Sequence, residues 1–120
     1  TAADQANPKV QEFFTKGAAA GLQEAELQGG IAAAGWGFGA LFVRGLELTP
    51  TVDRATLMNT LYSLDGENFG LALDDAAAHT NGADDPWIIE DLRVIKRTAG
   101  SWEGVTELIS YDGKSNDFVG

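Results

Sequence analysis

The sequence predicts an α/β fold in which three helices precede a β-hairpin. Three observations lead to this prediction. An Asn-Pro pair at positions 7–8 opens an amphipathic stretch, and a long run of apolar and small residues occupies positions 31–48. Two aromatic-rich segments near the end, residues 87–97 and 102–110, are separated by a short turn sequence. Helical periodicity in the first half and alternation in the second favour helices followed by strands.

The first helix is expected to begin at the Asn-Pro pair. Asn7 is a good N-cap, and Pro8 suits the first helical position. The residues that follow at the spacing of one helical face are Val10, Phe13, Phe14 and Gly17. Gly21 is expected to end this helix, and residues 22–30 are expected to form a connector.

The second helix is predicted over residues 31–48. Glycines at positions 35, 37, 39 and 45 each disfavour a helix by about 1 kcal/mol relative to alanine, which leaves a strand over residues 35–42 open. The length of the run and its 3.6-residue period favour the helix. Its small residues would let it lie close to a sheet or to another helix.

A third, shorter helix is expected after the Thr49-Pro50-Thr51 break, with Thr51 or Asp53 as its N-cap. Its expected core face consists of Leu57, Leu61 and Leu64. Gly66 is expected to stop the helix. Residues 69–73 are expected to form a short strand, and residues 74–85 a polar loop.

The hairpin is predicted from two alternating segments. Residues 87–97 alternate from Glu90 onwards, residues 98–101 have turn composition, and residues 102–110 return as the second strand. Asp112 and Gly113 mark a further turn.

Composition excludes several classes of function. The net charge is −10, with 5 acidic residues in positions 1–50 and 13 in positions 51–120, which argues against nucleic acid and anionic membrane surfaces as partners. The chain has no cysteine, which excludes disulfides and thiolate metal sites. We expect no transmembrane helix, because no uninterrupted run of about 18 apolar residues occurs. The first residues also lack the basic and apolar regions of a signal peptide.

No catalytic or metal-binding pattern is found, so we expect no enzyme activity, cofactor or metal. His79 is the only histidine, and with its acidic neighbours it fits no zinc spacing, which favours a solvated loop position. Asp112, Asn116 and Asp117 suggest calcium only loosely, because the glycine and terminal glutamate of an EF-hand are absent. An acidic hydrolase is disfavoured, since no spacing singles out a pair of carboxylates.

The order of these segments resembles the C-terminal part of the type I periplasmic solute-binding proteins of ABC importers, the branched-chain amino-acid (Leu/Ile/Val-binding) family. In that family an aromatic-Asp-Ala segment opens a lobe-1 helix and leads to Ala-Leu nine and ten residues later. Trp36 takes the aromatic position here, and Gly45 and Leu46 take the Ala-Leu position. Gly37 stands where the family usually has Asp, which is a departure.

The resemblance implies a ligand-binding set, which consists of Gly30, Ile31, Ala34 and Trp36. These residues would approach the cleft between two lobes, where the apolar side chain of Ile31 would pack against the ligand. A glycine-rich helix start would also leave N–H groups free for a carboxylate. The alternative, that Ile31 and Trp36 are ordinary core residues, stays open.

The resemblance further implies part of a two-lobed periplasmic-binding-protein type I fold. Residues 1–68 would form a lobe-1 helical segment, and residues 69–120 a crossover and lobe-2 strand segment. The receptor would bind an amino acid or similar small molecule between its lobes and deliver it to a membrane ABC permease. It would lie in the periplasm or another extracytoplasmic space, with its signal peptide outside this chain. The remaining N-terminal part, or a domain-swapped second copy, would cover the apolar face of the second helix.

A second hypothesis is a small acidic α+β protein-interaction domain with no role in transport. The family likeness would then be accidental, and the acidic loop over residues 74–85 would face a basic protein partner.

Overall fold

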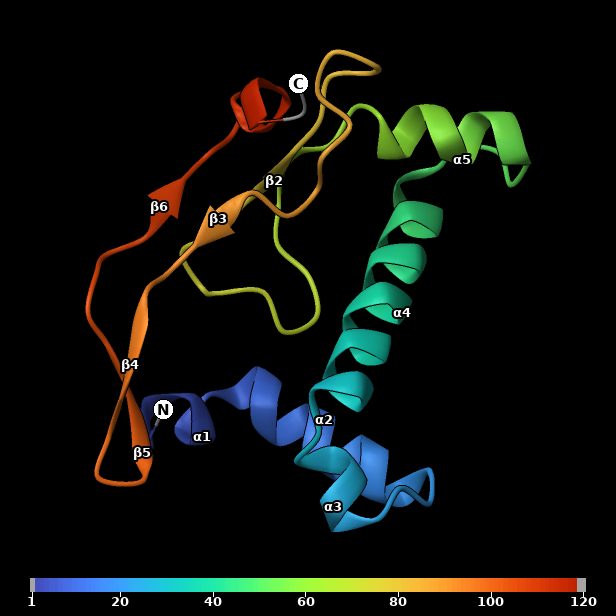
Figure 1. Ribbon diagram of the computed structural model, residues 1–120. Coiled ribbons are helices and arrows are strands. Elements are labelled where there is room, and N and C mark those ends of the chain that lie inside the picture. Colours follow the sequence, from blue (N-terminus) through green and yellow to red (C-terminus); the bar gives the residue numbers. More distant parts are fainter. Residues whose placement is uncertain (1, 119–120) are drawn as a thin grey trace.

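The computed structural model describes residues 2–118 (Figure 1). The helices of this part of the chain are α1 (Ala2–Ala6), α2 (Pro8–Ala19), α3 (Glu24–Leu27), α4 (Gly30–Leu48) and α5 (Arg54–Leu61). They are followed by β1 (Asp65–Glu67), β2 (Ala78–His79), β3 (Asp91–Leu92), β4 (Ile95–Thr98), β5 (Ser101–Gly104), β6 (Ile109–Ser110) and the 3-10 helix η1 (Ser115–Phe118). Helices thus precede small antiparallel sheets, which confirms the α/β class.

α4 is the longest element and sets the layout of the molecule. In Figure 1 it runs from α2 and α3 at one end to α5 at the other, while β3 and β6 lie across from it. The strands pair in three separate two-stranded antiparallel sheets, β1 with β2, β3 with β6, and β4 with β5. The loop between β1 and β2 occupies the space between α4 and the strands (Figure 1).

α2 forms as the sequence predicts. The side chain of Asn7 accepts a hydrogen bond from the N–H of Lys9 at 2.9 Å, and Pro8 is the first helical residue. Gly21 follows the helix with a φ of 93°, the left-handed conformation that favours glycine at a helix end. The predicted connector over residues 22–30 is wrong in part, because it holds α3. There the N–H of Gln23 donates to the carboxylate of Glu26 at 2.7 Å, which caps the short helix.

α4 is a helix over its whole predicted length, and its glycines allow close packing. A Cβ atom built on Gly45 would lie 2.9 Å from Cδ2 of Leu61 in α5. A Cβ built on Gly70 would lie 3.2 Å from Cα of Gly37, so the loop after β1 also approaches α4 closely. The prediction that small residues bring this helix near its neighbours is confirmed.

α5 begins as predicted but ends early. The carboxylate of Asp53 accepts from the N–H of Thr56 at 3.0 Å, whereas the helix stops at Leu61 rather than at Gly66. The reason is tertiary: the hydroxyl of Thr80 donates to the carbonyl of Leu61 and accepts from the N–H of Leu64, each at 2.8 Å. A residue of the following segment therefore satisfies the helix end.

Three further predictions about the second half are corrected. Gly66 lies inside β1, and residues 69–73 form turns instead of a strand. The expected polar loop over residues 74–85 contains β2, in which Nδ1 of His79 lies 3.2 Å from the carboxylate of Asp65. His79 thus lies in a strand pair instead of a loop, while its side chain remains 41% exposed to solvent.

The predicted hairpin is confirmed at its turn. β4 and β5 pair from Ile95↔Gly104 to Thr98↔Ser101, and the two turn residues, Ala99 and Gly100, have φ angles of 47° and 87°. Two positive φ angles match the type I′ turn that suits a two-residue hairpin. The strands are shorter than predicted, since residues 93–94 and 105–108 interrupt them before β3 and β6 form their own pair.

The molecule is open. Its accessible surface is 8224 Å², whereas a compact monomer of this mass exposes about 6,200 Å². Its radius of gyration is 16.0 Å, against about 13.6 Å expected for 120 residues. Among the described side chains, the buried hydrophobic ones are Phe13, Leu27, Leu64 and Ala78. Ile31 and Phe38 of α4 are 91% and 67% exposed, so part of the apolar surface of this helix faces solvent.

α4 is relevant to the expectation that the chain contains no transmembrane helix. Over residues 2–118, this helix is long and apolar enough to cross a membrane by length and composition, with a mean hydropathy of 1.2. The expectation depended on an uninterrupted run of apolar residues. In α4, glycines and alanines separate the large apolar residues, yet the mean hydropathy of the helix is still high enough for a membrane span. One such helix is weak support for a membrane span, because core helices and signal sequences share these properties.

Candidate functional site

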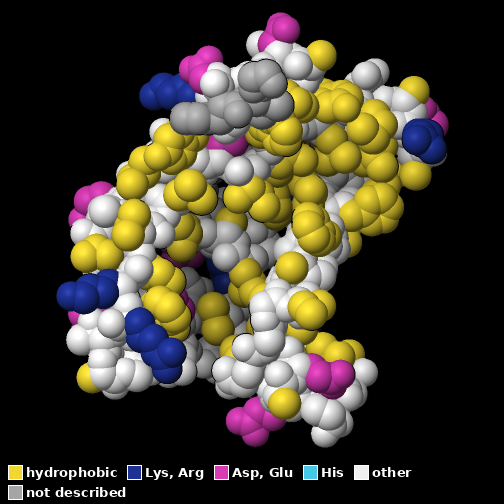
Figure 2. Space-filling model, viewed as in Figure 1, with side chains coloured by type: hydrophobic (Ala, Val, Ile, Leu, Met, Phe, Trp, Pro, Cys, Tyr) yellow, Lys and Arg dark blue, Asp and Glu magenta, His cyan; other side chains and the backbone are white. Residues whose placement is uncertain are grey.

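A cavity of about 590 Å³ lies between α4 and the segment that runs from β1 to β3. α4 contributes Ala33, Ala34, Gly37, Phe38 and Leu41 to its wall. The opposite wall contains Phe69, Leu71, Leu73, the alanines at 76–78, and residues 86–91. Figure 2 shows hydrophobic side chains gathered along α4 and α5, beside a hollow between α4 and the strands. The cavity is therefore lined mainly by apolar side chains.

The loop that forms one wall is held against α2. The ammonium group of Lys9 contacts Oδ1 of Asn68 at 2.5 Å and Oδ1 of Asp74 at 3.1 Å. The side-chain amide of Asn7 donates to Asp74 at 2.7 Å. Asn68 in turn donates to the carbonyls of Leu73 and Ala76 at 2.8 and 2.7 Å. These bonds fix both the start and the middle of the loop.

Two ion pairs tie the same loop region to its other neighbours. Nε of Arg44 in α4 donates to Glu67 of β1 at 2.8 Å. The hydrogen bonds that Arg44 donates to Glu67 and then to Glu47 raise the pKa of Arg44 above its usual value. The guanidinium of Arg93 donates to both carboxylate oxygens of Asp75, at 3.0 and 2.7 Å. The cavity thus lies between elements that polar contacts hold together.

The polar side chains of the wall are few and acidic. The described wall contains no serine, threonine or histidine, so it offers no side chain of the kind used in nucleophilic triads. Of its acidic residues, Glu67 is paired with Arg44, and Asp91 accepts from the N–H of Ala77 at 2.9 Å. Glu90 also lines the cavity. An apolar enclosure of this size fits a small molecule.

The structure separates the four residues predicted as ligand-binding. Ala34 lies in the wall of the cavity, whereas Gly30 is the exposed first residue of α4. Ile31 is 91% exposed, so the alternative interpretation of Ile31 as a core residue is wrong. Trp36 is half-buried on another side of α4 and contacts Phe13 of α2, with ring centroids 5.7 Å apart. Packing is therefore at least part of the role of Trp36.

The wall formed by residues 67–91 was not predicted. A short strand over residues 69–73 and a polar loop over residues 74–85 were expected there, and glycines, alanines and acidic residues dominate the composition of the stretch. The available signal was the set of large apolar residues within that stretch, namely Phe69, Leu71, Leu73, Ile88 and Ile89. Apolar residues in a long connection indicate a segment that packs against something.

A second hollow of about 840 Å³ lies between α2, α4 and residues 68–70. Trp36 lines it together with several charged residues. Those charges are paired with one another or with the adjacent loop: Lys16 with Glu12 at 2.6 Å, and Arg44 with Glu47 at 3.2 Å. We therefore regard it as a solvated groove between helices.

Comparisons with known proteins add no identification. Neither protein-family models nor curated proteins nor solved structures show a match to this chain. The resemblance to solute-binding proteins therefore stays a prediction.

Proposed function

We propose that this chain is the C-terminal part of a non-enzymatic solute-binding receptor of the type I periplasmic kind. The observation that carries the proposal is the position of the 590 Å³ cavity. It lies between α4, from the predicted lobe-1 segment, and residues 69–91, from the predicted crossover and lobe-2 segment. A type I receptor binds its ligand between two such parts and closes on it by a hinge motion.

The proposed ligand is an amino acid or similar small molecule with an apolar side chain. The volume falls within the range of about 300–1,000 Å³ that is typical of ligand sites. Ala34 leaves room on the α4 side, and Phe38 and Leu41 supply apolar contact. The ammonium and carboxylate groups would be held mainly by the rest of the receptor. The loaded receptor would deliver its ligand to a membrane ABC permease in an extracytoplasmic space.

The exposed surface supports completion of the fold by a further polypeptide. The chain exposes about 2,000 Å² more than a compact monomer of its mass. A standard protein interface buries about 800 Å² on each partner, so this excess is enough for one. The exposed side chains of Phe38, Phe42 and Val43 lie along α4. The remaining N-terminal part of the receptor, or a swapped second copy, would cover them.

Thermal unfolding with added amino acids tests the proposal. We expect leucine, isoleucine, valine or phenylalanine to raise the Tm of the chain, with glutamate and lysine as controls. Ala34→Leu fills the cavity and should abolish the rise, whereas Ala55→Leu, on the exposed side of α5, should keep it. Absence of any rise, both in this chain and in a longer receptor containing it, would contradict the proposal.

The exposed apolar face of α4 and the net charge of −10 also favour the second hypothesis, a small acidic α+β protein-interaction domain. Asp74 and Asp75 are engaged within the chain by Lys9 and Arg93, so the acidic surface left for a basic partner centres on Asp84 and Asp85. Sedimentation velocity over a wide concentration range separates the cases. A dimer whose association is weakened by Phe42→Ser indicates a second copy on α4. A monomer whose Tm does not change on adding amino acids favours a different protein partner.

A further inference from the structure

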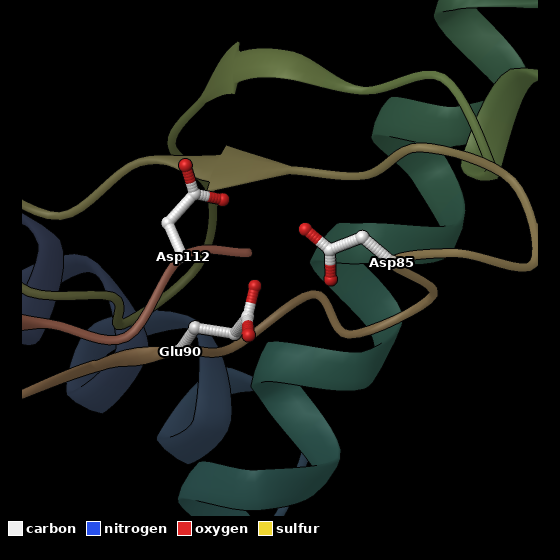
Figure 3. A group of neighbouring side chains, drawn as sticks. All are labelled: Asp85, Glu90 and Asp112. Carbon is white, nitrogen blue, oxygen red and sulfur yellow. The ribbon is translucent and has the colours of Figure 1, made fainter. Parts of the chain in front are cut away.

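Three acidic side chains converge beside the cavity: Asp85, Glu90 and Asp112. One carboxylate oxygen from each lies within 4.8 Å of the others. Figure 3 shows the three carboxylates facing a common space. Asp85 lies in the turn before β3, Glu90 directly precedes β3, and Asp112 follows β6. The group is thus assembled from segments that are up to 27 residues apart in the sequence.

Glu90 is the unusual member of this group. Glu90 is 8% exposed, and both of its carboxylate oxygens are buried without a hydrogen-bond partner. Burial of an ionised carboxylate without a partner is strongly unfavourable, so native proteins pair such groups or use them as metal ligands. An unpartnered buried carboxylate that faces two others indicates a missing positive charge.

The surrounding side chains do not supply that charge. Among residues 2–118, no ion pair includes Asp85, Glu90 or Asp112. Arg93 follows β3, three residues after Glu90, but its guanidinium is bound to Asp75. Three carboxylates this close repel one another when ionised. A cation between them would convert that repulsion into attraction.

Backbone hydrogen bonds hold the three residues in place. The N–H of Tyr111 donates to the carbonyl of Glu90 at 3.1 Å, which aligns Glu90 with the residue before Asp112. The N–H of Asn81 donates to the carbonyl of Asp85 at 2.8 Å, which closes the turn that carries Asp85. The site is therefore largely formed before any ligand arrives.

Two further hydrogen bonds join the turn that carries Asp85 to the segment around Asn116. Nε1 of Trp87 donates to Oδ1 of Asn116 at 2.8 Å, and the side-chain amide of Asn116 donates to the carbonyl of Asp84. η1 is thereby fastened to the turn that carries Asp85. Asp112, between β6 and η1, is held from both sides.

We propose that Asp85, Glu90 and Asp112 bind a divalent cation, and that this cation is Ca²⁺. Ca²⁺ takes oxygen ligands at about 2.3–2.6 Å, so two oxygens on one ion lie at most about 5 Å apart, as these three do. The ligand set is oxygen only, which disfavours zinc and copper. Ca²⁺ also tolerates irregular ligand arrangements and completes its shell with water, unlike the more demanding Mg²⁺. The site does not depend on the proposed receptor function.

The way in which the site is assembled explains why the spacing of acidic residues in the sequence did not predict it. The looser calcium pattern considered above contains Asp112, but Asn116 of that pattern is occupied by Trp87 and Asp84. The ligands instead come together through the pairing of β3 with β6, where Asp91 lies opposite Ser110. No short motif encodes that pairing.

Calorimetric titration of the metal-free 120-residue chain with CaCl₂ tests the inference. We expect one site with a Kd between about 10⁻⁵ and 10⁻³ M. A tenfold excess of Ca²⁺ over the Kd should raise the Tm by on the order of 5 °C relative to EDTA. Glu90→Gln and Asp112→Asn should each weaken binding at least tenfold. Asp112 is exposed, so Asp112→Asn keeps the test valid if a buried substitution fails to fold.

Asp84→Asn is the matched control, because it removes one exposed negative charge beside the site without removing a ligand. Its affinity for Ca²⁺ should stay within about twofold of the wild-type value, since solvent and salt screen an exposed surface charge strongly and its contribution is small. Equal weakening by Asp84→Asn and Asp112→Asn would show diffuse attraction to an acidic surface and would overturn the proposal. Absence of both heat and a Tm change on adding Ca²⁺ would overturn it as well.

Discussion

The rings of Phe13 and Trp36 meet edge to face, with centroids 5.7 Å apart and an angle of 67° between their planes. This contact joins α2 to α4, and Phe13 is only 3% exposed. Edge-to-face pairs are favourable beyond the area they bury. The contact therefore anchors the N-terminal half of α4, the helix that forms one wall of the candidate cavity.

Replacing Phe13 should loosen this anchor. Phe13→Leu removes the aromatic pair while keeping an apolar side chain, and we expect a loss of about 1–2 kcal/mol in the free energy of unfolding. Urea denaturation monitored by tryptophan fluorescence measures it. Phe38→Leu is the control, because Phe38 is 67% exposed and should change stability by less than about 0.5 kcal/mol. Equal effects of the two substitutions would contradict a packing role for the contact.

Two glycines should respond oppositely to alanine. A Cβ on Gly17 would lie 2.4 Å from Cδ2 of the buried Leu27, whereas a Cβ on Gly39 would meet nothing within 4 Å. Gly39→Ala should raise stability by about 0.5–1 kcal/mol through helix propensity. Gly17→Ala should be less stable than Gly39→Ala by about 1–3 kcal/mol, because Leu27 must move. Denaturation midpoints compare the two, and a stabilising Gly17→Ala would show that α3 is loosely packed.

Removal of the Thr80 hydroxyl should weaken the junction after α5. Thr80 is 8% exposed, and its hydroxyl bonds both the carbonyl of Leu61 and the N–H of Leu64. Thr80→Val leaves both groups without this partner, so we expect a loss of about 1–3 kcal/mol. Thr15→Val serves as control, since the hydroxyl of Thr15 is exposed and bonds only within α2. Unchanged amide exchange at Leu64 in Thr80→Val would contradict the capping role.

The cap of α5 should make stability depend on pH. Hydrogen bonds from the hydroxyl and then the N–H of Thr56 lower the pKa of Asp53 below its ordinary value of 3.8. A lowered pKa in the folded state stabilises the chain above the unfolded value, and this contribution is lost as the pH falls through the folded value. The Tm advantage over Asp53→Ala should therefore be constant above about pH 5 and shrink below about pH 4.

Asp53→Asn is the control for that titration. Asparagine caps helices about as well as aspartate but carries no titrating carboxyl group. Its Tm difference from Asp53→Ala should stay the same across the same pH range. A parallel fall for both variants would assign the acid sensitivity to other carboxylates.

Local signals predicted the helices well where they act within a few residues. Asn7 with Pro8, and Asp53, mark helix starts that the structure confirms. The end of α5 could not be predicted, because Thr80, 19 residues after Leu61, terminates it. The interruption of the long strands was also missed, since alternation continues through residues 93–94 and 105–108, which lie outside the strands although the N–H of Val105 still donates to the carbonyl of Val94. Tertiary contacts outweigh local propensity in both places.

The candidate sites were predicted only in part. Ala34 lies in the cavity wall, but the opposite wall comes from a stretch of weak periodicity whose position depends on contacts with Lys9 and Arg93. The acidic group depends on the β3–β6 pair, which joins residues about twenty positions apart. Pairing of such short strands leaves almost no trace in the sequence, because two residues per strand are too few for a period.

The β4–β5 hairpin has a consequence for how the chain opens and associates. Its two strands form a sheet of their own, so both outer edges present unpaired backbone groups. All of β5 is exposed, and two-stranded ribbons are only marginally stable in water. Its amide protons should exchange with solvent long before those of α2. The charged side chains of Lys96, Arg97 and Glu103 along the ribbon discourage another strand from adding to its edges, which protects the chain from growing into fibrils.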